Sequence, residues 1–140
     1  MPKLILVRGV PGVGKTTYAK HLVNEFSYAH FEGDMYFERD GEYKFDYAKL
    51  GEAHAWCRAE TESAMQRGEN IVVSNTFCTL REMMPYIQMA RRHSYKVDVI
   101  TLKKEYGSIH GVPADRMQRF RERWEECSDL ADLLSAWCVA

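Results

Sequence analysis

One stretch near the start of the chain limits the possible folds more than any other. The residues Gly9-Val10-Pro11-Gly12-Val13-Gly14-Lys15-Thr16 satisfy the pattern G-x-x-x-x-G-K-[ST], which forms a phosphate-binding loop between a strand and a helix. The context fits, because the apolar run Leu4–Val7 precedes the pattern and an amphipathic segment follows it. The glycines let successive backbone N–H groups point into one concavity, to which the helix start adds its positive dipole end. The sequence therefore predicts a polyphosphate site at residues 9–16.

The side chains after the glycines have distinct predicted roles toward a bound nucleotide. Lys15 can reach the β- and γ-phosphates, and the hydroxyl of Thr16 is placed to bind Mg²⁺. Thr17 is expected to donate a hydrogen bond to the α-phosphate. ATP and Mg²⁺ are the predicted cofactors, with Thr16 as the metal ligand. The predicted nucleotide-binding residues are Gly9, Pro11, Gly12, Val13, Gly14, Lys15, Thr16 and Thr17.

Composition narrows the class of protein. A chain of 140 residues with 46% hydrophobic and 28% charged residues is expected to form a single folded domain over residues 1–140. A net charge of −1 argues against a nonspecific nucleic-acid binder, so any such contact requires a local patch. Without a C-x-x-C pair, the four cysteines predict neither a disulfide framework nor a structural metal. No signal peptide or apolar run of about 20 residues is present, which predicts a cytoplasmic protein without a membrane partner.

Hydrophobic periodicity predicts strands that alternate with helices. Strands are expected at 3–7, 28–31, 71–73 and 96–102, and helices at 15–26, 46–67 and 79–93, with two more after residues 113 and 128. Residues 37–45 are expected to be an exposed loop, and Asp46 to cap the helix that follows. Thr79-Leu80-Arg81-Glu82 has the form of a capping box, although Pro85 favours a regular helix that begins only near Glu82. This order predicts a three-layer α/β/α P-loop NTPase fold with a short parallel sheet of about four strands.

The ends of the second and third strands separate the classes of P-loop protein. An N-K-x-D motif is absent, which argues against a GTPase, and the third strand ends in Ser74-Asn75 rather than in the Asp usual for motor ATPases. This favours phosphoryl transfer to an organic acceptor over hydrolysis. An acceptor hydroxyl needs a carboxylate that takes its proton, and Asp34, directly after the second strand, is the candidate. The alternative is that Asp34 only caps the turn there.

Five stretches in a fixed order carry a family resemblance. They are Leu4–Thr17, Asp34-Met35-Tyr36-Phe37, Phe45–Ala59 with Ala53-His54-Ala55-Trp56, Ile71–Met89 with Asn75-Thr76, and Ile109-His110-Gly111-Val112-Pro113 followed by Met117. With them the chain resembles the kinase domain of bacteriophage polynucleotide 5′-kinases and their small stand-alone relatives. The resemblance implies that Asp34 is the general base, that residues of about 103–126 form a helical lid over ATP, and that the acceptor is the 5′-hydroxyl of DNA or RNA. A phage-encoded protein would then act in the host cytoplasm.

The chain departs from this family at several positions. Gly107 stands where the family has a lid arginine, so Arg116 and Arg119 are predicted to supply that charge to the reaction, with a solvated helix face as the alternative interpretation. Phe37 stands where phage enzymes have an arginine that contacts the acceptor's phosphate, and Arg39 is the candidate substitute. Ser74 leaves Mg²⁺ without a carboxylate at the end of the third strand.

Two further groups of side chains carry weaker signals. His54 lies on the apolar face of its helix and is interpreted as a packed core residue rather than a ligand. The aromatic residues between positions 36 and 47 either stack on an acceptor base or form the core beneath the loop.

The sequence thus predicts an ATP-dependent kinase with Lys15, Asp34, Arg116 and Arg119 as catalytic residues, acting on the 5′-hydroxyl of a polynucleotide. A kinase for a nucleoside, a modified DNA base or another small molecule is one alternative. A non-catalytic ATP-binding module is the other, favoured by Gly107 and Ser74.

Overall fold

The computed structural model describes residues 1–38, 41–102, 118–119 and 122–125. In this part, four parallel strands form one sheet in the order β2-β3-β1-β4, which confirms the predicted fold class. The elements in chain order are β1 (Lys3–Arg8), α1 (Lys15–Phe26), β2 (Ala29–Phe31), a first 3₁₀ helix (Gly33–Glu38), a second 3₁₀ helix (Tyr47–Lys49), α2 (Leu50–Gln66), β3 (Ile71–Asn75), α3 (Leu80–Arg92) and β4 (Lys96–Thr101).

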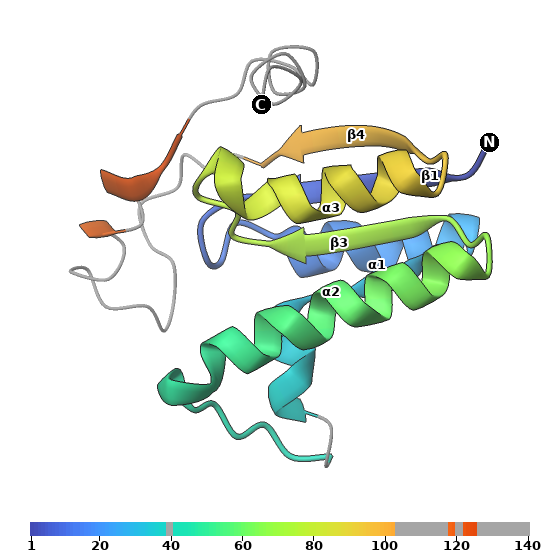
Figure 1. Cartoon of the computed structure of the whole chain (residues 1–140). Helices are drawn as coiled ribbons and strands as arrows, with labels where there is room; N and C mark the ends of the chain where they lie inside the picture. Colours follow the sequence, from blue (N-terminus) through green and yellow to red (C-terminus); the bar gives the residue numbers. More distant parts are fainter. Residues whose placement is uncertain (39–40, 103–117, 120–121, 126–140) are drawn as a thin grey trace.

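The central strand β1 shows why the sheet is covered on both faces. Its side chains alternate, so that Leu4 and Leu6 join the core beneath α2 and α3, whereas Ile5 and Val7 join the core beneath α1. All four are buried. Figure 1 shows α1 behind the sheet, and α2 and α3 in front of it. A strand that is apolar on both faces thus produces the predicted three layers.

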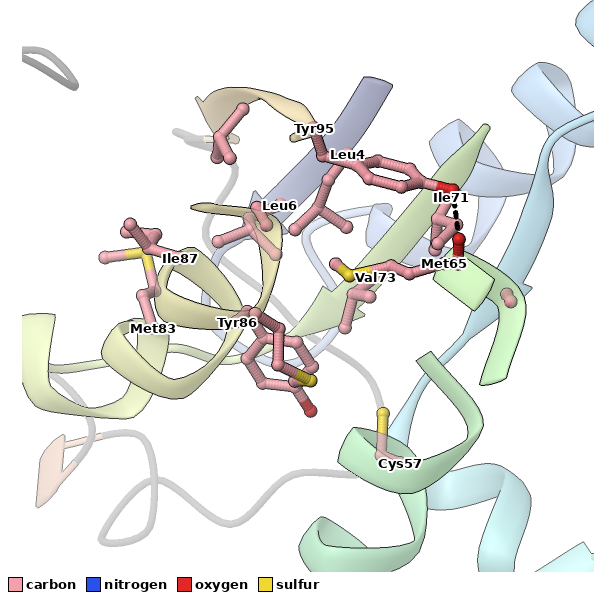
Figure 2. Close-up of a cluster of buried hydrophobic side chains, with 14 of the residues drawn as sticks. Leu4, Leu6, Cys57, Met65, Ile71, Val73, Met83, Tyr86, Ile87 and Tyr95 are labelled. Carbon is pink, nitrogen blue, oxygen red and sulfur yellow. Dashed lines mark hydrogen bonds between the residues drawn. The ribbon is translucent and has the colours of Figure 1, made fainter. Parts of the chain in front are cut away.

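The larger core lies between the sheet and the helices α2 and α3. Figure 2 shows aliphatic side chains of β1 and β3 meeting Met83, Tyr86 and Ile87 of α3. Tyr95 closes one end of this core, and its hydroxyl donates to the carbonyl oxygen of Glu69 at 2.7 Å and to that of Met65 at 3.4 Å. Burial of each large apolar side chain contributes about 1.5–3 kcal/mol, so this layer is a main source of the stability of the fold.

The start of α3 differs from the prediction. The helix begins at Leu80, two residues before Glu82, and Thr79 makes no side-chain cap hydrogen bond. Instead, the carboxylate of Glu82 accepts from the backbone N–H of Cys78 at 2.9 Å, and that of Glu125 accepts from Leu80 N–H at 2.8 Å. A carboxylate from a distant segment thus satisfies one of the unpaired N–H groups at the helix start, and the predicted capping box does not form.

The region between β2 and α2 corrects a second prediction. The segment from Phe37 onward does not start as an exposed loop, because residues 33–38 form a 3₁₀ helix in which Phe37 is buried. Asp46 is a cap, as predicted, but of the short 3₁₀ helix before α2, where it accepts from Ala48 N–H at 3.0 Å. Within the described part of the chain, none of the helices combines the length and apolarity that crossing a lipid bilayer requires.

Candidate active site

The phosphate-binding loop connects β1 to α1 at the carboxyl edge of the sheet. Gly14 takes the N-cap position of α1 with a φ of 103°, a backbone conformation that favours glycine. Gly9 is buried, and a Cβ there would lie 2.6 Å from Cγ1 of Val13 and 3.0 Å from the carbonyl oxygen of Leu102. Two of the four defining positions of the motif therefore need glycine for separate reasons, one conformational and one steric.

Lys15 lies across this loop, within the electrostatic influence of two carboxylates. Its ammonium donates to the carbonyl oxygen of Val10 at 3.1 Å. Burial lowers the pKa of Lys15, while the negative charges of Glu32 and Asp34 oppose that lowering. The lysine is thus held over the loop by an easily replaced carbonyl partner, in the electrostatic field of both acidic residues.

Thr16 is part of a hydrogen-bonded chain that the sequence analysis did not identify. Its hydroxyl donates to Oε2 of Glu32 at 3.0 Å, and the hydroxyl of Ser74 donates to the same oxygen at 2.8 Å. Nε2 of His30 lies 2.7 Å from the Ser74 hydroxyl oxygen and 3.5 Å from Glu32 Oε2. Burial by itself would raise the pKa of Glu32, but the hydrogen bonds from His30, Ser74 and Thr16 outweigh it, so this pKa lies below its usual value.

These groups fit a hard divalent cation. Hydroxyl and carboxylate oxygens are the donors that Mg²⁺ prefers, and protein Mg²⁺ sites are usually completed by water and substrate phosphates. In the described ranges, His, Cys, Asp and Glu side chains nowhere form a group of three that could hold a metal ion by itself. Thr16 and Glu32 therefore fit a metal whose remaining ligands would be water and the phosphates of a nucleotide.

Asp34 lies in the first turn of the 3₁₀ helix that follows β2, and it is exposed. Asn75, at the end of β3, fixes this turn, because its Oδ1 accepts from the backbone N–H of Gly33 at 2.8 Å. The amide of Asn75 is in turn within 3.8 Å of Sγ of Cys57 on α2. The residue before the candidate base is thus attached to the neighbouring strand, a role of Asn75 that the sequence analysis did not identify.

The interpretation of His54 as a packed core residue is wrong. The residue is exposed, although one side of its ring faces the turn, and a Cβ at Gly33 would lie 3.6 Å from its Nδ1. Partial burial of the ring lowers the pKa of His54, with nearby Arg58 acting in the same direction and the charges of Glu82 and Asp34 opposing it. His54 therefore borders the site beside Asp34.

The aromatic residues beyond Asp34 divide into a buried centre and an exposed rim. Phe37 is buried, and its ring packs against Tyr36, Tyr43 and Phe45 at centroid distances of 5.5, 6.4 and 5.1 Å. Tyr43 is 54% exposed and Phe45 39% exposed. Phe37 thus forms the core beneath the segment, as one interpretation had it, whereas stacking of an acceptor base on the exposed rings stays a prediction.

A buried arginine connects the loop strand with a segment far along the chain. The guanidinium of Arg8 donates to the carbonyl oxygens of Phe77 at 3.0 Å, Cys78 at 3.3 Å and Glu125 at 2.6 Å, and it lies 4.0 Å from the ring centroid of Trp124. The residues described near position 118 and at 122–125 lie beyond the end of the sheet to which the strands point (Figure 1). Arg8, which directly precedes the loop, thus fixes residues 124–125 at the carboxyl edge.

The predicted lid can be followed only in part. Arg116, Gly107 and the substitute Arg39 lie outside the described residues, and so does the helix predicted after Ser128. Arg119 is described and exposed, and its catalytic role stays a prediction. Arg123 is also described, and its guanidinium pairs with Glu82 of α3 at 2.8 Å.

Comparisons with known proteins show what this chain is similar to. Human NEDD4-binding protein 2 is 32% identical over 144 residues, which cover 95% of this chain but 8% of that protein. An Acanthamoeba polyphaga mimivirus protein named as a bifunctional polynucleotide phosphatase/kinase is 26% identical over 93 residues, 66% of this chain and 18% of that protein. The crystal structure of a gluconokinase from Sinorhizobium meliloti 1021 superimposes with a TM-score of 0.58 at 18% identity, covering 89% of this chain and 76% of the gluconokinase.

A protein-family model also matches most of the chain. The model AAA_33, described as an AAA domain, matches residues 4–126, a range that includes all of the sheet except Lys3, the phosphate-binding loop and Asp34. The fold is that of the P-loop kinases. From the loop, the sheet and this match, the chain belongs to the AAA_33 family of AAA domains.

Proposed function

We propose that this domain transfers the γ-phosphate of ATP to a hydroxyl group, and that the acceptor is the 5′-hydroxyl of a DNA or RNA strand. The proposal depends most on the position of Asp34. Its carboxylate is exposed in the turn directly after β2, and its charge acts on Lys15 of the phosphate-binding loop. In-line phosphoryl transfer to a hydroxyl requires a proton acceptor within reach of the transferred phosphate.

In this mechanism Asp34 orients the acceptor hydroxyl and accepts its proton. The acceptor oxygen forms a bond to the γ-phosphorus as the bond from that phosphorus to the bridging oxygen of the β-phosphate breaks, and ADP leaves with that oxygen. Lys15 and the N–H groups of the loop stabilise the charge on the phosphate oxygens. Mg²⁺, when bound, neutralises further charge on the β- and γ-phosphates, and Thr16 would hold it.

The lid arginines complete the proposed assignment of roles. Arg116 and Arg119 would supply positive charge to the transferring phosphoryl group in place of the arginine that is missing at Gly107. The guanidinium of Arg123 pairs with Glu82, and Arg123 is given no role in this assignment.

Two observations favour a polynucleotide over a small acceptor. The mimivirus relative is named for polynucleotide phosphatase and kinase activities, and its similarity extends over two thirds of this chain. Exposed rings of Tyr43 and Phe45 lie close to Asp34 along the chain, and exposed aromatic rings are platforms on which unpaired bases stack. The gluconokinase likeness concerns the fold, and a small-molecule acceptor is an alternative that the experiment below separates.

The test is transfer of labelled γ-phosphate from ATP and Mg²⁺ to 5′-hydroxyl DNA and RNA oligonucleotides, with 5′-phosphorylated oligonucleotides as the matched negative substrate. We expect label on the 5′-hydroxyl strands alone, and its loss with Lys15→Ala and with Asp34→Asn. Label on nucleosides or sugars but on no oligonucleotide would move the acceptor to small molecules. Binding of an ATP analogue with no transfer to any acceptor would instead indicate a non-catalytic module.

A further inference from the structure

The carboxylate of Glu32 accepts hydrogen bonds from two hydroxyl groups. Thr16 and Ser74 each have one hydroxyl proton, and both donate it to Oε2 of Glu32, at 3.0 and 2.8 Å. Because the Thr16 proton is directed to Glu32, the lone pairs of its hydroxyl oxygen are available for another partner. The side chain of Glu32 is 17% exposed, so the carboxylate is mostly shielded from water while part of its surface remains accessible.

Glu32 also lies next to a position from which an acidic residue is missing. In P-loop NTPases a carboxylate at the end of a neighbouring strand holds Mg²⁺ together with the Ser or Thr of the loop. Here β3, the strand beside β1, ends in Ser74 and Asn75. The register of β2 on β3 pairs Phe31 with Val73, so the next residue on each strand, Glu32 and Ser74, come together at the carboxyl edge.

We propose that Glu32 supplies from β2 the carboxylate that holds the magnesium ion of Mg²⁺–ATP together with Thr16, and that Ser74 and His30 are its positioning residues. Ser74 stands where the missing carboxylate would be and fixes Glu32 by its hydrogen bond. Since Ser74 donates to Glu32, Nε2 of His30 carries the proton that meets the Ser74 oxygen at 2.7 Å. Glu32 is thus held directly by Thr16 and Ser74, and His30 holds Ser74, in the way that hydrogen-bonded partners orient a ligating carboxylate at a metal site.

The negative charge of Glu32 makes the proposed role distinguishable from simple damage to the fold. Without a metal, the negative charge of Glu32 repels the triphosphate, whereas with Mg²⁺ the same charge attracts the ion. Glu32→Gln keeps the shape and can still accept hydrogen bonds from Thr16 and Ser74. It should therefore weaken nucleotide binding in Mg²⁺ but leave it unchanged or strengthen it in EDTA, whereas damage to the loop would weaken both.

The measurement is the affinity of the non-hydrolysable analogue AMP-PNP by isothermal titration calorimetry, in Mg²⁺ and in EDTA, on the full chain. In the parent protein Mg²⁺ should strengthen binding. Glu32→Gln should reduce affinity in Mg²⁺ by about 10- to 100-fold or more, because the loss of even an outer-shell partner of a metal ligand usually costs that much. Glu69→Gln, in an exposed pair with Arg67, is the matched control and should behave as the parent protein does.

A second variant moves the carboxylate from position 32 to position 74. In the double variant Glu32→Gln, Ser74→Asp the negative charge returns to the end of β3, and we expect at least a fivefold recovery of AMP-PNP affinity in Mg²⁺ over Glu32→Gln alone. Electron paramagnetic resonance of Mn²⁺ with AMP-PNP supplies a direct readout of the metal. Its bound fraction should fall with Glu32→Gln and rise again in the double variant.

This inference rests on the proposed binding of Mg²⁺–ATP, but not on the acceptor, so the two can fail separately. Equal loss of affinity in Mg²⁺ and EDTA, or a Glu32→Gln variant that keeps the full Mg²⁺ effect, would overturn the role of Glu32 and leave the kinase proposal standing. A parent protein that binds no AMP-PNP under either condition would overturn both. Altered metal dependence in a protein that phosphorylates no oligonucleotide would support Glu32 and reject only the proposed acceptor.

Discussion

The phosphate side and the acceptor side of the candidate site are built in opposite ways. On the phosphate side, Thr16, Glu32, Ser74 and His30 form a mostly buried chain of hydrogen bonds beneath a loop whose glycines allow little variation. On the acceptor side, Asp34 is exposed on a short 3₁₀ helix and is followed by aromatic rings that are open to solvent.

This difference in burial fits the part that each side would have in the proposed reaction. Charge on a triphosphate develops at the same atoms whatever the acceptor, so fixed donors and charges give the greatest stabilisation there. An acceptor varies in size and shape, and exposed elements can change without disturbing the core. We therefore expect substitutions on the phosphate side to abolish all transfer, and substitutions on the acceptor rim to change which acceptor is used.

The largest loss is expected from Asp34→Asn, which keeps the size of the side chain but removes the base. Transfer should fall by about 10²- to 10⁴-fold, the usual contribution of a positioned acid or base, with AMP-PNP affinity unchanged. Steady-state transfer and calorimetry measure the two quantities. Asp98→Asn, in an exposed pair with Lys3, is the control. Undiminished transfer by Asp34→Asn would remove this residue as the base and favour its alternative role as a turn cap.

Lys15→Ala is expected to reduce transfer by about 10²- to 10³-fold, because it removes one charged donor from the transferring phosphate. In contrast to Asp34→Asn, this change should also weaken AMP-PNP binding in calorimetry. Lys20→Ala, at an exposed position of α1, tests for a general effect of removing a lysine from that helix. If Lys15→Ala bound nucleotide as the parent does, the assignment of the phosphate side would be wrong.

The features predicted correctly from sequence are those with local causes. Helix α1 was predicted at residues 15–26 and is observed as Lys15–Phe26, because the loop motif marks its start and its apolar stripe is continuous. A strand was predicted at residues 3–7 from an unbroken apolar run, and β1 is observed there, between β3 and β4. Both signals are contained within about a dozen neighbouring residues.

The features that the sequence analysis missed depend on contacts between distant segments. Glu32 meets Thr16 and Ser74 only through the register of β2 on β3. The earlier start of α3 depends on Glu125, which is 45 positions away. A charged residue at the end of an apolar strand, such as Arg8, indicates that the side chain has a buried partner. It does not indicate which residue that partner is. Such contacts follow from the assembled sheet, so a local pattern cannot contain them.

Asn75→Ala tests whether the attachment of Gly33 to the end of β3 positions Asp34 on the acceptor side. The backbone N–H of Gly33 would lose its acceptor, which costs about 1–2 kcal/mol of the free energy of unfolding, and the shifted turn should reduce transfer by about tenfold. Asn70→Ala is a close control, because Asn70 also accepts a backbone N–H, that of Lys3 at 2.9 Å, but just before β3 begins. Urea unfolding should show losses in both variants, whereas only Asn75→Ala should reduce transfer. Equal activity of the two variants would show that Asp34 does not depend on the attachment of Gly33.

The smallest effect is expected from Tyr43→Ala on the rim of the acceptor side. If a base of the acceptor stacks there, its loss should raise the KM for an oligonucleotide about fivefold, at the low end of base–aromatic stacking because the ring is already half exposed. AMP-PNP affinity and the free energy of unfolding should stay as in the parent protein. Phe26→Ala, which removes an exposed ring at the far end of α1, should change none of these quantities. A KM that rises for oligonucleotides but not for a nucleoside acceptor would assign the rim to polynucleotide binding, whereas an unchanged KM for both would restrict acceptor recognition to the immediate surroundings of Asp34.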